Sequence, residues 1–442
     1  MKSTNQNGAD RRDSTQAALS RREFIASAAV STAALASMHG IARAAWAGGG
    51  ETIHVGVIGC GGRGTGAAIN ALEADPATRI VALADLFPDR LESSRNYLAS
   101  DERFADRAKV EPDRCFTGFD AYQKLLATDV DVVILATPPH FRPIHFRAAV
   151  DAGKHVFMEK PVAVDAWGVN SVIQAGADAA AAGLSVVAGT QRRHEASYLA
   201  AMDAMRSGDF GRIISARCYW NQGGLWVHHR KPEYSDMEWQ CRNWLYFCWL
   251  SGDHIVEQHV HNLDVINWAL GATPLRCLGM GGRQVRTGPE YGNIYDHFAV
   301  EYIYPGDVHV LSMARQIEGT AFRCEEVIHA TGGVATLRPG FAAIGATGGG
   351  NDWRFSERNN NPYVQEHADL FAAIRSGKPI NEARQVAEST LTAIMGRESA
   401  YTGQEITWEQ MLASTRRLAP PAYEFGDLPV DEVPVPGRTK FE

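Results

Sequence analysis

Residues 52–66 read TIHVGVIGCGGRGTG, and this stretch decides how the rest of the chain is interpreted. Apolar, largely β-branched residues lead into Gly59, Gly61 and Gly64 in the spacing G-x-G-x-x-G, and helix-compatible residues follow. The order predicts a strand, a tight turn and the start of a helix. In such a turn one glycine makes the bend, one lets the backbone approach a pyrophosphate, and one lets helix and strand pack closely.

An acidic residue about twenty positions downstream strengthens this prediction. Residues 79–86 (RIVALADL) are typical of a second strand, and Asp85 lies at its end. A carboxylate there can hold a ribose hydroxyl and would repel a 2′-phosphate. The sequence therefore predicts a dinucleotide fold that takes NAD in preference to NADP. The candidate cofactor residues in this part of the chain are Gly59, Gly61, Gly62, Arg63, Gly64 and Asp85.

Strands and helices continue to alternate after the loop. Residues 130–137 (VDVVILAT) form a continuous apolar run, typical of a parallel strand buried on both faces. A shorter strand at 155–158 leads into Glu159-Lys160-Pro161, and another is expected at 185–189. Ligands bind beyond the carboxyl ends of such strands. Five residues are therefore expected at the nicotinamide end of the crevice: Thr137, Pro138, Glu159, Lys160 and Gln191.

The second half of the chain shows a different pattern. Alternating runs at 212–220, 299–304, 308–314 and 325–337 predict antiparallel strands, and helices are expected at 196–205, 363–376 and 384–401. The predicted fold class is α/β: an N-terminal Rossmann domain and a C-terminal α+β domain with a large, mostly antiparallel open sheet. The expected domains are residues 45–190 for dinucleotide binding, 191–417 for substrate and oligomerisation, and 418–442, with five prolines, as an extended arm.

The first 44 residues resemble a twin-arginine export signal. Arg21-Arg22 precedes a mild apolar run that ends near Ala42-Arg43-Ala44. The run is only about fifteen residues long, short of the roughly twenty needed to span a bilayer. We therefore expect export to the periplasm and no stable membrane insertion.

Charge and cysteine content exclude several classes. Removing residues 1–44 takes away six basic and three acidic side chains and moves the formal charge from -8 to -11. An acidic body argues against nucleic acid as a partner. The seven cysteines contain no C-x-x-C pair, so they predict neither a zinc framework nor a dense disulfide scaffold.

Five of the ten tryptophans fall between residues 220 and 249, among polar side chains that include Asn221 and Arg242. Aromatic faces beside hydrogen-bonding groups suit stacking on a sugar. The same tryptophans could equally bury a loop, and the sequence does not separate these alternatives.

Three segments together resemble the glucose–fructose oxidoreductase, inositol dehydrogenase and rhizopine-catabolism (Gfo/Idh/MocA) family. They are GCGGRG at 59–64, VILATPP at 133–139 and AGKHVFMEKP at 152–161, and the resemblance extends over roughly residues 53–397. It implies that Lys160 touches both cofactor and substrate hydroxyl, and that the Lys160-Pro161 bond is cis. It also implies a carbohydrate substrate and a homo-oligomer paired through the open sheet.

Residues 251–270 (SGDHIVEQHVHNLDVINWAL) have helical period and are expected to carry the chemistry. Members of the family usually place Asp, then His four residues later, then Asp three further on. His261 and Asp264 match, whereas Glu257 stands where Asp is usual. We interpret His261 as the base that takes a hydroxyl proton, oriented by a carboxylate on the same helix face. The candidate catalytic residues are Lys160, His261 and Glu257, and the candidate substrate contacts are Lys160, Arg193, Trp220, Asn221, His261 and Asp264.

A metal site is the alternative for this stretch, with His254, His259 and His261 as ligands beside Asp253 and Glu257. His259 and His261 are two residues apart, so they point to opposite sides of a helix and cannot easily share one ion. No metal is therefore predicted.

Three functions remain open from the sequence. The first is an NAD(P)-dependent oxidoreductase acting on a secondary hydroxyl of a sugar, polyol or glycoside, with a tightly held cofactor that is regenerated in place. The second is an NAD-dependent glycoside hydrolase or lyase, which oxidises a ring hydroxyl, expels a glycosidic oxygen and returns the hydride. The third is a non-catalytic sugar-binding relative, against which the presence of both Lys160 and His261 argues.

Overall fold

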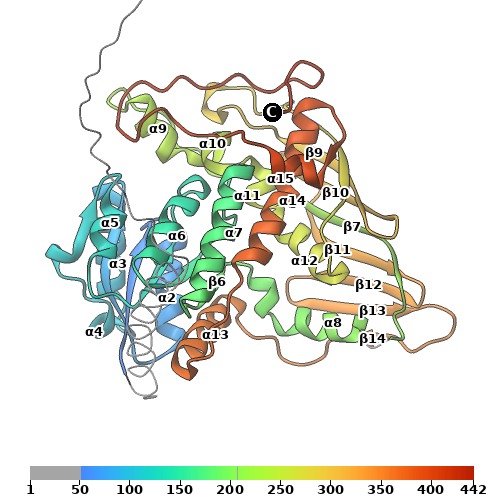
Figure 1. Ribbon diagram of the computed structural model, residues 1–442, viewed down its shortest axis with the longest axis horizontal. Coiled ribbons are helices and arrows are strands. Elements are labelled where there is room, and N and C mark those ends of the chain that lie inside the picture. The colour runs from blue at the N-terminus through green and yellow to red at the C-terminus, as the bar shows by residue number, and fades with distance from the viewer. Residues whose placement is uncertain (1–50, 207) are drawn as a thin grey trace, which may run out of the picture. The chain divides into compact units, whose positions relative to one another are not determined.

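The computed structural model describes residues 51–206 and 208–442 (Figure 1). The predicted export signal lies outside these residues. In the part of the chain that the structure describes, no helix combines the length and the apolar character needed to cross a bilayer.

The first half forms a parallel sheet of six strands in the order β3-β2-β1-β4-β5-β6. This is the strand order of a doubly wound dinucleotide fold. Its strands are β1 (Ile53–Ile58), β2 (Thr78–Asp85), β3 (Cys115–Thr117), β4 (Val132–Leu135), β5 (His155–Met158) and β6 (Val186–Ala188). Its helices are α2 (Gly62–Ala74), α3 (Pro88–Ser100), α4 (Ala105–Ala108), α5 (Ala121–Leu126), α6 (Arg142–Asp151) and α7 (Ala166–Ala181).

Burial explains why these sequences form these elements. All four residues of β4 are buried, as expected for a central strand covered by helices on both faces. Helix α2 turns Ala67, Ala68, Ala71 and Leu72 toward the sheet, which is the spacing of one helix face. The small side chains allow α2 to lie close to the strand that precedes it.

The second half forms a sheet of nine strands in the order β14-β13-β12-β11-β7-β10-β9-β8-β15. Neighbouring strands are antiparallel except for β7 and β10, which run parallel. The strands are β7 (Ile213–Gln222), β8 (Arg276–Gly282), β9 (His297–Tyr304), β10 (Val308–Gln316), β11 (Arg323–Ala330), β12 (Gly333–Arg338), β13 (Phe341–Ala346), β14 (Trp353–Arg354) and β15 (Ile406–Thr407). Together with the first sheet, this confirms the predicted fold class. The run predicted at 325–337 is a hairpin of β11 and β12.

Long helices connect the two sheets. Helix α14 (Ala383–Thr402) packs against α7 on one side and against β8 and β9 on the other, and Figure 1 shows it beside α7, between the sheets. Helix α13 (Pro362–Ser376) packs on α2, while α8 (Ala196–Arg206) lies against β13. The largest hydrophobic core runs through both sheets and α14 without interruption. The short helices α9 (Asp236–Arg242), α10 (Cys248–Ser251) and α15 (Trp408–Ala413) complete the body.

The prediction of one continuous helix over residues 251–270 is wrong. The chain forms α11 (His254–Glu257), breaks at Gln258, and starts again as α12 (Val260–Leu270). Glu257 and His261 therefore lie on two different helices. Gly252 ends α10 in a left-handed conformation, and Asp253, with φ +72° and ψ 162°, is also outside the helical region before α11 begins.

Residues 414–442 contain no helix or strand, yet they are not loose. Their backbone or side chains are hydrogen-bonded to Asp165, Met237, Gln240, Tyr295 and Thr402. In Figure 1 this arm runs past α9 and α10 before the chain ends.

Candidate active site

The three glycines of the turn meet different surroundings. Gly59 has φ +100°, and a Cβ there would lie 2.5 Å from the backbone nitrogen of Thr137. A Cβ on Gly64 would lie 1.7 Å from the carbonyl oxygen of Gly59. A Cβ on Gly61, in contrast, would approach only the end of the Arg90 side chain, at 3.6 Å. Gly59 and Gly64 are thus required by the fold itself, whereas the space over Gly61 is open, as a backbone cradle for a pyrophosphate needs.

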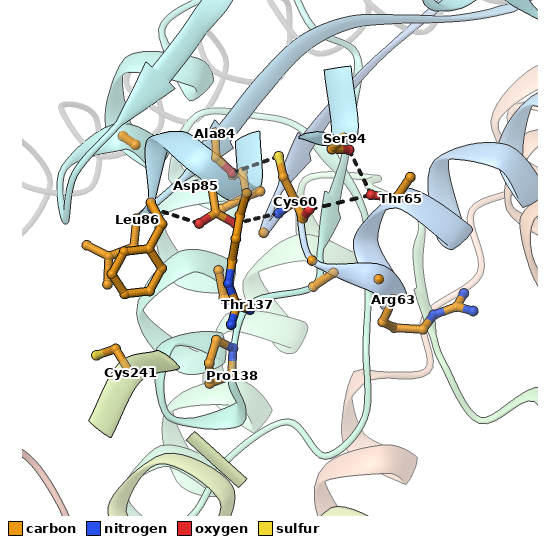
Figure 2. A pocket seen from close by; sticks show the side chains of 18 of the residues that line it. Cys60, Arg63, Thr65, Ala84, Asp85, Leu86, Ser94, Thr137, Pro138 and Cys241 are labelled. Atoms are coloured by element: carbon orange, nitrogen blue, oxygen red, sulfur yellow. Dashed lines mark hydrogen bonds between the residues drawn. The ribbon is translucent and has the colours of Figure 1, made fainter. Parts of the chain in front are cut away.

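Asp85 lies at the carboxyl end of β2 and points toward this turn (Figure 2). Its carboxylate accepts hydrogen bonds from the backbone nitrogens of Cys60, at 2.6 Å, and Phe87, at 2.8 Å. Burial raises the pKa of this carboxyl, although both backbone hydrogen bonds act in the opposite direction. The carboxylate therefore also fixes the shape of the glycine turn, a role that the sequence did not reveal.

A cavity of about 1130 Å³ extends from the glycine turn along the carboxyl ends of β1, β2 and β4. Its first wall belongs to the Rossmann domain and includes Gly59, Gly61, Asp85, Thr137 and Pro138. Its second wall comes from the segment after β7, and Figure 2 shows Cys241 of that wall across the pocket from Cys60 and Asp85. The residues of the second wall are Trp226, His228, Cys241 and Trp244.

Sequence reasoning missed this second wall. The cluster of tryptophans was the available signal, but nothing in the sequence places it opposite a glycine turn more than 150 residues away. The structure confirms the burying role for two of these tryptophans, and stacking on a sugar stays a prediction. Trp239 and Trp249 are buried in a separate hydrophobic cluster, whereas Trp226 and Trp244 line the cavity.

The ends of β4 and β5 are tied together by a buried arginine. Arg142 donates to the carbonyl oxygens of Thr137, at 2.7 Å, and Glu159, at 2.8 Å. Burial lowers the pKa of this guanidinium to about 10. The two strand ends predicted to meet at the crevice are thereby held in fixed positions.

Arg63 and Glu159, both predicted cofactor residues, are bonded to each other. Arg63 Nε lies 2.5 Å from Glu159 Oε1, and in Figure 2 its side chain points away from Asp85. The Arg63 guanidinium also lies over the ring of Tyr363, whose hydroxyl accepts a hydrogen bond from Gln191. The Glu159 carboxylate neutralises the charge of Arg63. The backbone N–H groups of the glycine turn are therefore the main groups available to bind an anion.

Lys160 connects the two domains. The Lys160-Pro161 peptide bond is cis, as the resemblance implied. Lys160 Nζ lies 2.9 Å from Glu257 Oε1 and also donates to the carbonyl oxygen of Glu257. The break between α11 and α12 is what makes this carbonyl available, because it lies at the end of α11.

His261 lies beside Lys160 and Glu257, but it is held by an aromatic contact and not by an ion pair. Its ring stacks on Trp220 of β7, with 5.7 Å between ring centroids and 21° between planes. Burial, and then the charge of Lys160, lowers the pKa of His261 well below its ordinary value, so the ring is neutral at pH 7. Among the described residues, no hydrogen bond is made to its ring nitrogens. A neutral imidazole with a free nitrogen is available to accept a proton.

The expectation that a carboxylate orients His261 is wrong. Glu257 is bonded to Lys160, and Asp264 accepts two hydrogen bonds from Arg193, at 2.8 and 2.9 Å, and a third from Ser389. Stacking on Trp220 is the contact that holds the His261 ring instead.

Asn221 does not join the predicted substrate contacts. It follows Trp220 in β7, and consecutive residues of a strand point to opposite faces of the sheet. Trp220 lies on the face that carries α12 and His261, so Asn221 points to the other face.

The remaining histidines of this stretch have separate partners. His259 is bonded to Ser312 Oγ at 2.7 Å, and His254 packs its ring edge against Phe298. Burial lowers the pKa of His259 to about 3. Among the described residues, no three His, Cys, Asp or Glu side chains form a group that could hold a metal ion.

The sequence is similar to those of known oxidoreductases and of a glycosyl hydrolase. Residues 53–187 match the model of an oxidoreductase family with an NAD-binding Rossmann fold. The chain is 24% identical to inositol 2-dehydrogenase of Rhizobium meliloti over 340 residues, which cover 74% of this chain and 91% of that protein. It is 35% identical to a glycosyl hydrolase family 109 protein of Streptomyces coelicolor over 115 residues, which cover 26% of this chain and only 23% of that protein.

The crystal structure of an aldose–aldose oxidoreductase from Caulobacter crescentus has the same fold, with a TM-score of 0.62 and 16% sequence identity over 81% of this chain and all of that chain. Fold, glycine turn and cavity define the class as a two-domain, NAD(P)-dependent oxidoreductase. The family model that residues 53–187 match is that of the Gfo/Idh/MocA oxidoreductases. NAD fits the open space over Gly61 and the carboxylate of Asp85, as predicted.

Proposed function

We propose that this protein oxidises a secondary hydroxyl of a neutral sugar, polyol or glycoside and regenerates its NAD in place. The observation that carries the proposal is the position of Lys160, bonded to Glu257 at the domain boundary and beside the neutral imidazole of His261. NAD, when bound, supplies the hydride acceptor. The rest of the chemistry belongs to side chains of this chain.

The roles follow from charge and geometry. Lys160 can donate a hydrogen bond to the substrate hydroxyl and stabilise negative charge on its oxygen as the proton leaves. His261 takes that proton, because its ring is neutral and lacks a partner among the described residues. Glu257 holds the ammonium of Lys160 in position. Trp220 fixes the imidazole plane by stacking.

The paired charges around the site favour a neutral substrate. Around His261, Lys160 is bonded to Glu257, Arg193 to Asp264 and Arg192 to Glu326. Each of these described cations already has its own carboxylate. A carboxylate or phosphate on the reacting ring would therefore be buried without a counter-charge, which is unfavourable. A neutral ring with hydroxyl groups meets no such cost.

We place the enzyme in the periplasm, because of the twin-arginine motif at Arg21-Arg22. Free NAD is expected to be scarce there, so an enzyme that only oxidised would stop after one turnover. We infer that a second carbonyl compound takes the hydride back. We also expect the enzyme to form a homo-oligomer through the open sheet.

A second candidate is NAD-dependent cleavage of a glycoside, favoured by the likeness to the glycosyl hydrolase family 109 protein. Oxidation of a ring hydroxyl would acidify the neighbouring C–H, loss of that proton would expel the glycosidic oxygen, and water would add before the hydride returns. The overall reaction is then hydrolysis with no net redox change.

The test begins with mass spectrometry of nucleotide released from the denatured protein. The intact protein is then offered neutral polyols, sugars and aryl glycosides, and both ketone and free aglycone are measured. NAD in the protein and ketone formation support the first function, whereas aglycone release without net ketone supports the second. Absence of NAD or NADP from the protein, together with no binding of added nucleotide, would reject both.

A further inference from the structure

The segment after β7 contacts the Rossmann domain at the end of the cavity where Asp85 forms part of the wall. Arg242, the last residue of α9, makes two hydrogen bonds to Asp89 of α3, at 3.0 and 3.1 Å. Its guanidinium lies 3.9 Å from the centre of the Phe87 ring. The Arg242 carbonyl oxygen accepts a hydrogen bond from Arg90, at 3.2 Å. One residue of the second domain therefore contacts three of the four residues 87–90 in the nucleotide-binding domain.

These contacts lie in the wall of the cavity, at one end of it. Phe87, Asp89 and Arg90 line it on the Rossmann side, and Cys241 and Trp244, on either side of Arg242 in sequence, line it from the second domain. In this fold the carboxylate at the end of the second strand marks the ribose of the adenosine half. Asp85 occupies that place, only two residues before Phe87.

The C-terminal arm supports the same contact from behind. Phe425 stacks on Phe87, with 6.0 Å between ring centroids and 13° between planes, and lies 5.4 Å from the ring of Phe119. The arm also holds α9: Met237 N donates to the carbonyl oxygen of Gly426, and Gln240 donates to that of Leu428 at 2.6 Å. Phe87 thus contacts both Arg242 and Phe425, and α9 cannot move away without breaking bonds to the arm.

We propose that Arg242 and the C-terminal arm form a clasp that keeps the adenosine half of NAD from leaving its site. Arg242 is a positioning residue here, because it acts through Phe87, Asp89 and Arg90. The inference rests on the proposed function only in that NAD is the ligand. It explains how a nucleotide could stay bound through many turnovers, which in-place regeneration requires.

The contact between Arg242 and Asp89 is partly open to solvent, since 63% of the Asp89 side chain is exposed. An ion pair of this kind contributes modestly and is weakened by salt. The stacking on Phe87 depends less on salt, because the Phe87 ring is uncharged and buried. Loss of either stacking partner is expected to speed NAD release about tenfold, the effect of a contact worth roughly 1.4 kcal/mol.

The experiment measures the rate at which bound NAD leaves the full-length protein, with an NAD-hydrolysing enzyme in excess to destroy whatever is released. The variants are Arg242→Ala, Phe425→Ala and Asp89→Asn, and the matched control is Arg276→Ala, which removes an exposed ion pair with Glu405 on the second sheet. Arg242→Ala and Phe425→Ala should release NAD about tenfold faster, and Arg276→Ala at the parent rate. Salt should speed release from the parent and have less effect on Asp89→Asn.

Release from Arg242→Ala and Phe425→Ala within twofold of the parent rate, with unchanged melting temperatures, would overturn the clasp and leave the proposed function standing. If a variant does not fold, Asp89→Asn and its salt dependence decide the question, since the substitution keeps the side-chain shape at an exposed position. A parent protein that binds no nucleotide at all would instead reject the proposed function.

Discussion

Lys160 Nζ lies 2.9 Å from Glu257 Oε1, and this contact joins the end of β5 to the break between α11 and α12. The glutamate is longer than the aspartate usual at this position in the resembling family. It carries its own ion pair with the lysine, while His261 is held separately on Trp220. In the proposed function, the group that holds the substrate oxygen, Lys160, and the group that takes its proton, His261, are thus held by different neighbours.

We expect His261→Ala and Lys160→Ala each to lower turnover by about 10² to 10⁴, because a positioned acid–base group typically contributes that much. Bound NAD should remain, since neither residue belongs to the glycine turn. Turnover and the NAD content of the purified variants are measured together. A His261→Ala variant with full activity would exclude the assigned base.

Gly61→Val should abolish NAD binding and leave the fold intact. The added side chain would fill open space that the protein does not use, so the cost in stability should not exceed about 2 kcal/mol. Gly64→Ala is the contrasting variant, because its Cβ would overlap the Gly59 carbonyl oxygen and should cost more than about 3 kcal/mol. Calorimetric titration with NAD and urea denaturation separate the two effects. Undiminished NAD affinity in Gly61→Val would refute the assignment of the cradle.

NAD should bind more tightly than NADP, because Asp85 would lie against a 2′-phosphate. Asp85→Asn should make the affinities for NAD and NADP more nearly equal. The substitution also disturbs the hydrogen bonds that the carboxylate accepts from Cys60 and Phe87. Parallel titrations of both nucleotides into nucleotide-free protein provide the comparison. Tighter binding of NADP by the parent would show that the carboxylate does not select the cofactor.

Stability should fall between about pH 6.5 and 10 because of His194. This buried ring lies between Asp369, at 2.6 Å, and Glu382, at 3.3 Å. Although burial opposes the charge, these two carboxylates raise the pKa of His194 to about 10. The folded state therefore keeps a proton that the unfolded state loses above about pH 6.5, and its stabilising effect disappears as pH rises through that window. The urea denaturation midpoint should decrease steadily from pH 7 to 8 to 9. In His194→Gln the midpoint should depend less on pH.

Turnover should need no added NAD. Substrate added to protein that contains its own nucleotide should give at most a transient rise in absorbance at about 340 nm, followed by continued product formation. A single stoichiometric rise that stops, with more product only after fresh NAD is supplied, would instead identify an ordinary dehydrogenase.

The sequence by itself determined the nucleotide-binding half. Gly59, Gly61, Gly64 and Asp85 act within one βαβ unit, where local spacing fixes which atoms meet. The strand ends at Thr137 and Glu159 could be aligned because parallel strands end at a common edge. The alternating runs of the second half likewise predicted an antiparallel sheet, because period-two patterns reflect one buried face.

Tertiary structure alone decided how the second half completes the site. The chain breaks after Glu257, and both α11 and α12 pack against α14, a long-range arrangement that helical periodicity cannot report. The partners of Glu257 and Asp264 are Lys160 and Arg193, and both lie more than 70 residues away in the chain. Phe87 contacts both Arg242 and Phe425, and these contacts join three distant segments. Local sequence specifies which residues share a face, but only the packed chain brings such faces together.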